Sequence, residues 1–259
     1  MVESIDGSIV YLALPKMAVD LSTGISLLSW VATAYLVANS AMVVQAGKLA
    51  DVFSKKKIFL IGIGVFGLSS ALVGLSPSVY LVIFFRVLQG LSSTFLAATG
   101  FPMIFAYFPS KRAATAMGIA SAAWAVGAAS GPVLGGFLVA INWRFIFFIN
   151  VPIAILVVLV GLKAIPHEQD LKNHREHTSI LKQLNVLSSV ILAFTITTAL
   201  MGLTLFSFVY AVLAVAGAAG FVWTEMKSSH PLINRELLQT KGFVYLLIGG
   251  GIITDVAVG

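Results

Sequence analysis

Residues 113–143 read AATAMGIASAAWAVGAASGPVLGGFLVAINW and contain no Asp, Glu, Lys or Arg over 31 positions. An α-helix needs about 20 apolar residues to cross the hydrocarbon core of a bilayer, so this stretch is long enough to span a membrane. Further uncharged runs of 18 to 42 residues occupy 21–47, 58–85, 87–110, 145–162 and 183–224. The sequence therefore predicts an all-α protein that crosses the membrane several times.

The composition of the 259-residue chain excludes several other classes of protein. Hydrophobic residues make up 59% of the chain and charged residues 10%, whereas soluble domains contain about 25% charged residues. The absence of cysteine excludes disulfide scaffolds and thiolate metal sites. The net charge of +6 does not indicate nucleic-acid binding, because the basic residues lie between apolar runs.

The sequence predicts neither an enzyme nor a metal site. No nucleophile stands with a general base, and no glycine loop is placed to hold phosphate. His174 and His177 are three residues apart, but no third ligand lies near them, so no metal and no cofactor are expected.

The apolar runs also predict how the chain is organised. Residues 1–15 are expected to be the distal part of a first helix that Pro15 closes, and the run 183–224 to form two helices with a tight turn near Met201 and Gly202. The other expected spans are 27–47, 57–76, 79–107, 113–141 and 144–165. The expected divisions are a six-helix bundle at 1–165, a polar connection at 166–182, two extra helices at 183–225, and a connection at 226–259 with a last helix that stops at Gly259.

Basic residues predict the orientation, because Lys and Arg collect in cytoplasmic loops. With alternating spans, 13 of the 16 basic residues fall on one side of the membrane. Lys16 and Arg144 fall on the other side, and Arg86 falls inside a span. We therefore expect the basic loops to be cytoplasmic and Pro15 to lie near the outer face.

Small and polar residues recur at helical spacing inside two of the spans. Gly127, Gly131 and Gly135 line one face of the fifth span, and such faces let membrane helices approach closely. Pro132 removes one backbone hydrogen bond and Gly136 adds to the small residues. The simplest interpretation of this pattern is tight helix packing.

The fourth span carries a polar stripe on an otherwise apolar helix. Arg86, Gln89, Gly90 and Ser93 stand at i, i+3, i+4 and i+7. A buried arginine is costly in a membrane, so Arg86 is expected to face the bundle interior and to have a partner. The alternative is that its side chain reaches the outer headgroups.

A basic loop follows the second span. It reads GKLADVFSKKK at 47–57, so Gly47 precedes Asp51 by four residues and Lys55 begins a run of three lysines. Gly47 is expected to permit a close helix contact, Asp51 to meet the dipole at a helix N-terminus, and the lysines to face headgroups. A generic cytoplasmic loop is the alternative.

These strings resemble motifs of the major facilitator superfamily. The loop at 47–57 is similar to its signature loop, although Val52 and Ser54 stand where a basic residue and a glycine are usual. Residues 127–136, GAASGPVLGG, resemble the antiporter motif, and 86–90, RVLQG, resemble the fourth-helix motif.

Two further strings resemble the fourteen-helix drug:proton antiporter branch. Residues 5–15, IDGSIVYLALP, resemble its first-helix motif, with Tyr11 in place of the usual asparagine. Residues 143–152, WRFIFFINVP, resemble its sixth-helix opening, and two extra spans after the sixth fit the same branch. The resemblance covers essentially the whole chain.

The resemblance implies proton-coupled efflux of hydrophobic or amphipathic small molecules by alternating access, in which two halves rock about a midplane site. The chain would be the first half of a plasma-membrane transporter, and its partners would be lipid, substrate, protons and the missing half. A fragment of this kind is expected to be unable to transport by itself. Candidate cavity residues are Tyr35, Asn39 and Gln89, with interhelical hydrogen bonding as the alternative for Tyr35 and Asn39.

The sharpest expectation concerns Asp6 and Arg86. Counted from Pro15 and from the start of the fourth span, both lie about 10 to 13 Å below the outer end, at 1.5 Å per residue. Arginine stabilises an ionised carboxylate while exclusion of water stabilises the neutral form, so the pair could couple transport to protons. A permanent structural ion pair is the rival interpretation.

Two other functions remain open at this point. One is a proton-coupled uptake symporter on the same scaffold, and the other is a non-transporting sensor or assembly protein. The two charges expected at the same depth argue against the second. An intramembrane enzyme is disfavoured because no catalytic set is present.

Overall fold

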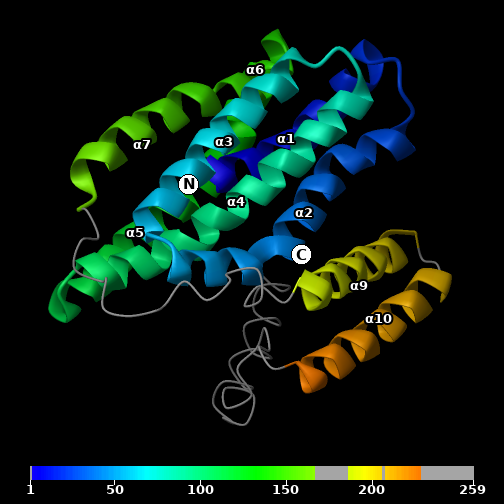
Figure 1. The fold of residues 1–259 in the computed structure, drawn as a ribbon. Coiled ribbons are helices and arrows are strands. Elements are labelled where there is room, and N and C mark those ends of the chain that lie inside the picture. Colours follow the sequence, from blue (N-terminus) through cyan, green and yellow to red (C-terminus); the bar gives the residue numbers. More distant parts are fainter. Residues whose placement is uncertain (1, 167–185, 206–207, 229–259) are drawn as a thin grey trace. The chain divides into compact units, whose positions relative to one another are not determined.

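The computed structural model describes residues 2–166, 186–205 and 208–228, and within those ranges it contains helices and connections but no strand (Figure 1). The chain divides into two compact units, residues 1–176 and 177–259. The predicted all-α architecture is confirmed.

The first unit is a bundle of helices. In chain order these are α1 (Val2–Asp20), α2 (Ile25–Val52), α3 (Lys55–Leu75), α4 (Val79–Tyr107), α5 (Ser110–Ile141), α6 (Phe145–Phe148) and α7 (Asn150–Ala164). Helix α4 packs between α2 and α3, α1 packs against α5, and α7 packs against α3 (Figure 1). The second unit contains α9 (Val186–Leu205) packed against α10 (Phe208–Lys227).

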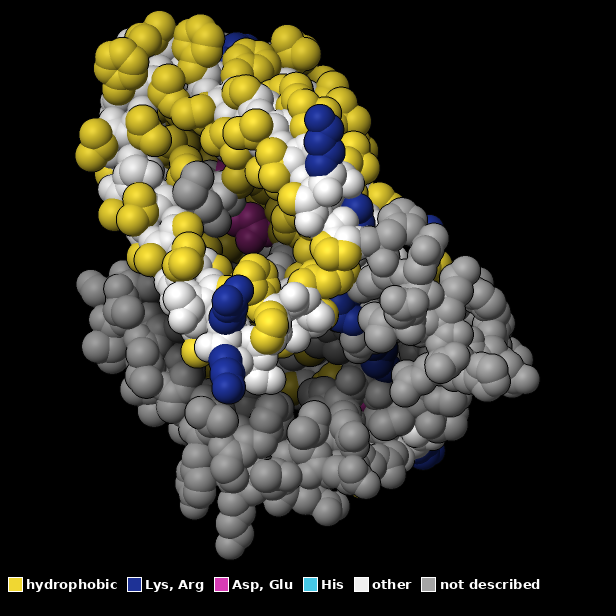
Figure 2. Space-filling model, turned by 90° about the vertical axis from the view of Figure 1, so that its left-hand side faces the viewer, with side chains coloured by type: hydrophobic (Ala, Val, Ile, Leu, Met, Phe, Trp, Pro, Cys, Tyr) yellow, Lys and Arg dark blue, Asp and Glu magenta, His cyan; other side chains and the backbone are white. Residues whose placement is uncertain are grey.

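Most of these helices are suited to a bilayer. Among the described residues, six segments are long and apolar enough to cross a membrane, namely Ile25–Val43, Lys55–Leu75, Val79–Tyr107, Ser110–Ile141, Phe145–Ala164 and Phe208–Lys227. Large hydrophobic side chains remain exposed along them, and Figure 2 shows such side chains over most of the described surface on one face. The chain is a multi-pass membrane protein.

Two predicted helix boundaries were wrong. Helix α1 continues through Pro15 to Asp20, because packing in a membrane bundle can compensate the backbone bond that proline removes. Helix α9 ends at Leu205 and α10 begins at Phe208, so Met201 and Gly202, where the turn was predicted, lie inside α9. Gly202 is a packing position, since a Cβ there would stand 3.2 Å from the backbone nitrogen of Ala211 on α10.

The sixth span, Phe145–Ala164, is one apolar stretch. Helix α6 ends at Phe148 and α7 begins at Asn150, while Ile149 between them has helical dihedral angles and donates to the carbonyl of Phe145. Asn150, the first residue of α7, is buried. Most of the two predicted polar connections, all four histidines and the last apolar stretch lie outside the described residues.

Three cations bind backbone carbonyls at the ends of neighbouring helices. Lys16 donates to two carbonyls at the end of α5, at 2.7 and 2.9 Å. Arg144 donates to two at the end of α3, at 2.9 and 2.7 Å. Lys56 is buried and donates to two at the end of α7, at 3.0 and 2.5 Å, so the prediction that all three loop lysines face headgroups was wrong. Unpaired C-terminal carbonyls attract cations, and this accounts for all three positions.

Candidate functional site

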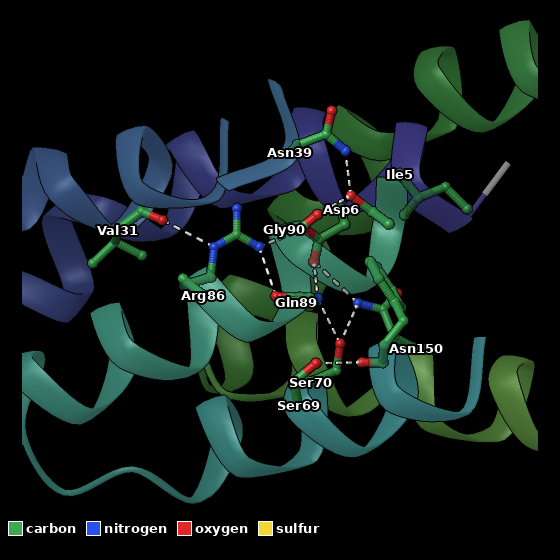
Figure 3. A network of polar contacts seen from close by, with 12 residues as sticks. Ile5, Asp6, Val31, Asn39, Ser69, Ser70, Arg86, Gln89, Gly90 and Asn150 are labelled. Carbon is green, nitrogen blue, oxygen red and sulfur yellow. Dashed lines mark hydrogen bonds and ion pairs between the residues drawn. The ribbon is translucent and has the colours of Figure 1, made fainter. Parts of the chain in front are cut away.

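A polar network lies in the interior of the first unit (Figure 3). It joins Asp6 of α1, Ser70 of α3, Arg86 and Gln89 of α4, and Asn150 of α7. None of these residues exceeds 1% exposure. Four helices therefore meet through side chains that are costly to place in a membrane unless they bind one another.

The carboxylate of Asp6 receives donors on both oxygens. Arg86 Nη1 donates to Oδ2 at 2.5 Å in a buried ion pair. Gln89 Nε2 and Asn150 Nδ2 each donate to Oδ1 at 3.1 Å. Because charge-assisted hydrogen bonds are about twice as strong as neutral ones, the arginine is the main partner of this carboxylate.

The guanidinium of Arg86 is held from three sides. Besides Asp6, it donates from Nη1 to Gln89 Oε1 at 2.8 Å and from Nε to the carbonyl of Val31 on α2 at 2.9 Å. Its Cζ lies 4.3 Å from the centre of the Tyr35 ring, which adds a cation–π contact. The predicted inward orientation of Arg86 is therefore what the structure shows, and the side chain does not reach the headgroups.

The polar stripe of α4 builds this arrangement. A Cβ at Gly90 would collide with the carbonyl of Tyr35, so the absence of a side chain lets α2 and α4 approach closely. One turn further on, Asn39 Nδ2 donates to Ser93 Oγ across the same contact. The stripe thus combines one close approach with two polar links to α2.

The three predicted cavity residues lie in different surroundings. Gln89 is fully buried in the network, donating to Asp6 and to Ser70 Oγ, the latter at 2.6 Å. Tyr35 is buried beneath Arg86, and Asn39 is half-buried. The interhelical hydrogen bond that was the alternative for Asn39 is present.

The glycine face of α5 packs against α1. Gly127, Gly131 and Gly135 are buried, together with Ala113 as the other buried residue of that helix. A Cβ at Gly131 would collide with the Ser8 side chain, and one at Gly135 would stand 2.6 Å from the Ile9 side chain. The small residues therefore set the distance between these two helices.

The remaining motif positions make looser contacts. A Cβ at Gly47 or at Gly136 would meet nothing within 4 Å, so the close approach expected at Gly47 does not occur among the described residues. Pro132 is exposed, and α5 continues through it as one helix. Lys55 is half-buried in the first turn of α3, and the side chain of Asp51 lies outside the described residues.

The sequence analysis gave no role to two members of the network, Asn150 and Ser70, or to Ser54 at the start of α3. Asn150 stands in the quoted stretch 143–152, where a single amide in an apolar run was the available signal. Nothing in the sequence indicated a role for Ser70 beyond its position in an apolar span. Ser54, noted only as a departure from the family loop, caps α3 by accepting from the backbone nitrogen of Lys57 at 3.4 Å.

Asp6 is the one carboxylate of the network, and Arg86, Gln89 and Asn150 donate hydrogen bonds to it. No group of three potential metal ligands occurs in the part of the chain that the structure describes. An ionisable side chain inside a membrane bundle typically marks an ion or proton pathway.

A helical membrane bundle with a charge pair buried between its helices is typical of membrane transporters. The chain belongs to the Major Facilitator Superfamily, since the model of that family matches residues 1–254.

Several curated proteins of the same family are similar to this chain. The multidrug transporter protein MdtP of Bacillus subtilis is 29% identical over 95% of this chain and 46% of its own length. The multidrug resistance protein Stp of Mycobacterium tuberculosis is 31% identical over 92% of this chain and 45% of its own length. The tetracenomycin C resistance and export protein of Streptomyces glaucescens is 36% identical over 62% of this chain and 30% of its own length. The chain thus spans about half the length, or less, of these relatives.

Proposed function

We propose that this chain provides the first half of a plasma-membrane transporter that exports hydrophobic or amphipathic small molecules in exchange for protons. The observation that carries the proposal is the buried Asp6–Arg86 ion pair, which joins α1 to α4 in the bundle interior. The names of the relatives, which include multidrug resistance and export, support efflux as the direction.

The ion pair provides the coupling chemistry. When water from the side of higher proton concentration reaches Asp6, protonation cancels its charge and weakens its bond to Arg86. The contact between α1 and α4 is therefore stronger when Asp6 is ionised and weaker when it is protonated. Figure 2 shows a hollow on one face of the bundle with an acidic side chain at its base, whereas Asp6 itself is completely buried, so the proposal requires water to enter further than this hollow.

The orientation and the role of the second unit belong to the same proposal. The basic loops face the cytoplasm, α9 and α10 link the two halves, and Tyr35 and Asn39 contact substrate when the halves separate. Alternating access needs two halves. Purified residues 1–259 in liposomes are therefore expected to show no proton-driven efflux, and robust efflux by this chain alone would contradict the proposal.

Replacement of the carboxylate tests the coupling. The complete reading frame is reconstituted in proteoliposomes, and drug movement is measured under an imposed pH gradient. Asp6→Asn is expected to fold and insert but to lose pH-driven transport, since the amide cannot be protonated in this pH range. Asp20→Asn is the matched control, because Asp20 stands at the end of α1 and accepts from Trp143 Nε1, at 2.8 Å, a bond that an amide oxygen can also accept.

Two results would refute this reasoning. Normal pH-driven transport by Asp6→Asn would leave the Asp6–Arg86 pair as a structural ion pair only. Substrate accumulation in the same direction as proton flow, measured by counterflow, would favour the uptake symporter instead of efflux.

A further inference from the structure

The side-chain oxygen of Asn150 is buried and has no hydrogen-bond partner. Asn150 is completely buried, and its Oδ1 accepts no donor, while its Nδ2 donates to Asp6 Oδ1 at 3.1 Å and to Ser70 Oγ at 3.3 Å. An unpaired buried carbonyl costs free energy, so its presence at the network calls for a physical reason.

The orientation of this amide follows from the charge of Asp6. An ionised carboxylate only accepts hydrogen bonds, so it must face the amide nitrogen of Asn150 and not the oxygen. A protonated carboxyl has a hydrogen to donate, and a facing amide nitrogen offers it no acceptor. The orientation in Figure 3 therefore fits the ionised form, and it is the wrong one for the protonated form.

We propose that Asn150 is a positioning residue whose amide rotates by half a turn when Asp6 binds a proton. A proton from water forms an O–H bond at Oδ1 of Asp6, because Oδ2 is occupied by Arg86. The rotated amide accepts this hydrogen on Oδ1, and the Ser70 hydroxyl turns its own hydrogen toward the same oxygen. Protonation is thereby transmitted from α1 to the first residue of α7, and this inference rests on the proposed function of Asp6.

Rotation of the neighbouring amide, that of Gln89, would cost more free energy. Gln89 Oε1 already accepts from Arg86 Nη1 at 2.8 Å, so rotation of Gln89 would direct an amide nitrogen at the guanidinium. Rotation of Asn150 breaks no hydrogen bond of its oxygen, which is unpaired, and moves the amide nitrogen into the space that this oxygen leaves. The amide that is free to rotate is therefore the one on α7.

The charged and titratable groups near Asp6 come from three helices. Arg86 of α4 binds it directly, and Tyr35 of α2 and Glu3 of α1 lie close enough to act on it electrostatically. The contacts that the structure shows from α3 and α7 to Asp6 and its partners are made by the neutral Ser70 and Asn150. The response of Asn150 is therefore a change of partner and not a change of charge.

Infrared difference spectroscopy tests the rotation directly. The purified 259-residue chain is placed in lipid nanodiscs with ¹³C at the side-chain carbonyl of its six asparagines, and spectra at acid and alkaline pH are subtracted. We expect a labelled amide band to shift over the same pH range in which the carboxylic band of Asp6 appears. Asp6→Asn should abolish the carboxylic band and the amide shift. Asn142→Ser is the matched control and should leave the carboxylic band and the amide shift unchanged, because Asn142 accepts from the Arg144 backbone nitrogen outside the network.

The outcomes separate this inference from the proposed function. A carboxylic band without any labelled amide shift would overturn the rotation and leave Asp6 as the proton site. Absence of the carboxylic band would overturn both.

Transport by the complete protein gives a second measurement that does not depend on the amide band. Asn150→Thr supplies a hydroxyl that can donate or accept, and it should keep proton-driven transport within about threefold. Asn150→Leu can do neither and should lose at least about tenfold, the effect of one buried hydrogen bond. Equal transport by the leucine and threonine variants would overturn the proposed role.

Discussion

Removal of the arginine should make the stability of the bundle depend on pH. In Arg86→Met, Asp6 keeps only the neutral donors Gln89 and Asn150 and has no countercharge. Breaking a buried ion pair by removing one partner costs about 3–5 kcal/mol. Asp6 can relieve this cost by taking up a proton, so the folded variant binds more protons than its unfolded state. Its free energy of unfolding should therefore fall as pH rises, by up to about 1.4 kcal/mol per pH unit.

The measurement is reversible unfolding in mixed micelles between pH 5 and pH 8, with a double-mutant cycle. Asp6→Asn should show little pH dependence, because Arg86 stays charged and retains the Val31 carbonyl and Gln89 as acceptors. The double variant Asp6→Asn/Arg86→Met buries no charge at this site and should be more stable at pH 8 than Arg86→Met by at least about 1 kcal/mol. The reasoning would be refuted if the stability losses of the two single variants added up to that of the double variant within about 0.5 kcal/mol and the stability of Arg86→Met did not change with pH.

Packing and helix ends give three smaller predictions for the same unfolding assay. Gly135→Val should lower the free energy of unfolding by about 1–3 kcal/mol, because the new side chain would overlap α1. Gly136→Ala should be neutral or stabilising by up to about 1 kcal/mol, because a Cβ there meets nothing. Equal effects of the two variants would contradict the assignment of the packed face. Lys56→Met should cost about 1–3 kcal/mol by leaving carbonyls of α7 unpaired, and the exposed Lys57→Met should change stability by less than about 0.5 kcal/mol. Ser54→Ala should cost about 1 kcal/mol through loss of the cap of α3, and an unchanged midpoint would show that the cap contributes nothing.

The sequence predicted the helices well because a bilayer imposes a length on every span. Uncharged runs of about 20 residues are rare outside membranes, so the second to fifth spans were placed within a few residues. The errors occurred where local rules met tertiary contacts. Pro15 and Gly202 predicted a helix end and a turn, but packing with neighbouring helices keeps both residues helical.

The candidate site could be predicted only where its residues are conspicuous in an apolar run. Arg86 is the single charged residue of α4, Asp6 is one of four charged residues of α1, and the structure places these two in contact. The comparison of depths that suggested this contact counted residues from Pro15, although α1 extends to Asp20. Counting residues along a helix was therefore a poor measure of depth in the membrane. Ser70 and Asn150 carry no charge, and the sequence gives no distance between α3 and α7.

The pairing of Asp6 with Arg86 also determines how the site responds to membrane voltage. As an ion pair the site has no net charge, and a proton on Asp6 leaves the single positive charge of Arg86 uncompensated. One elementary charge moved through 100 mV is worth about 2.3 kcal/mol. On the proposed mechanism, the step that carries the proton inward is therefore driven by the membrane potential, while the return of the deprotonated site is electrically silent.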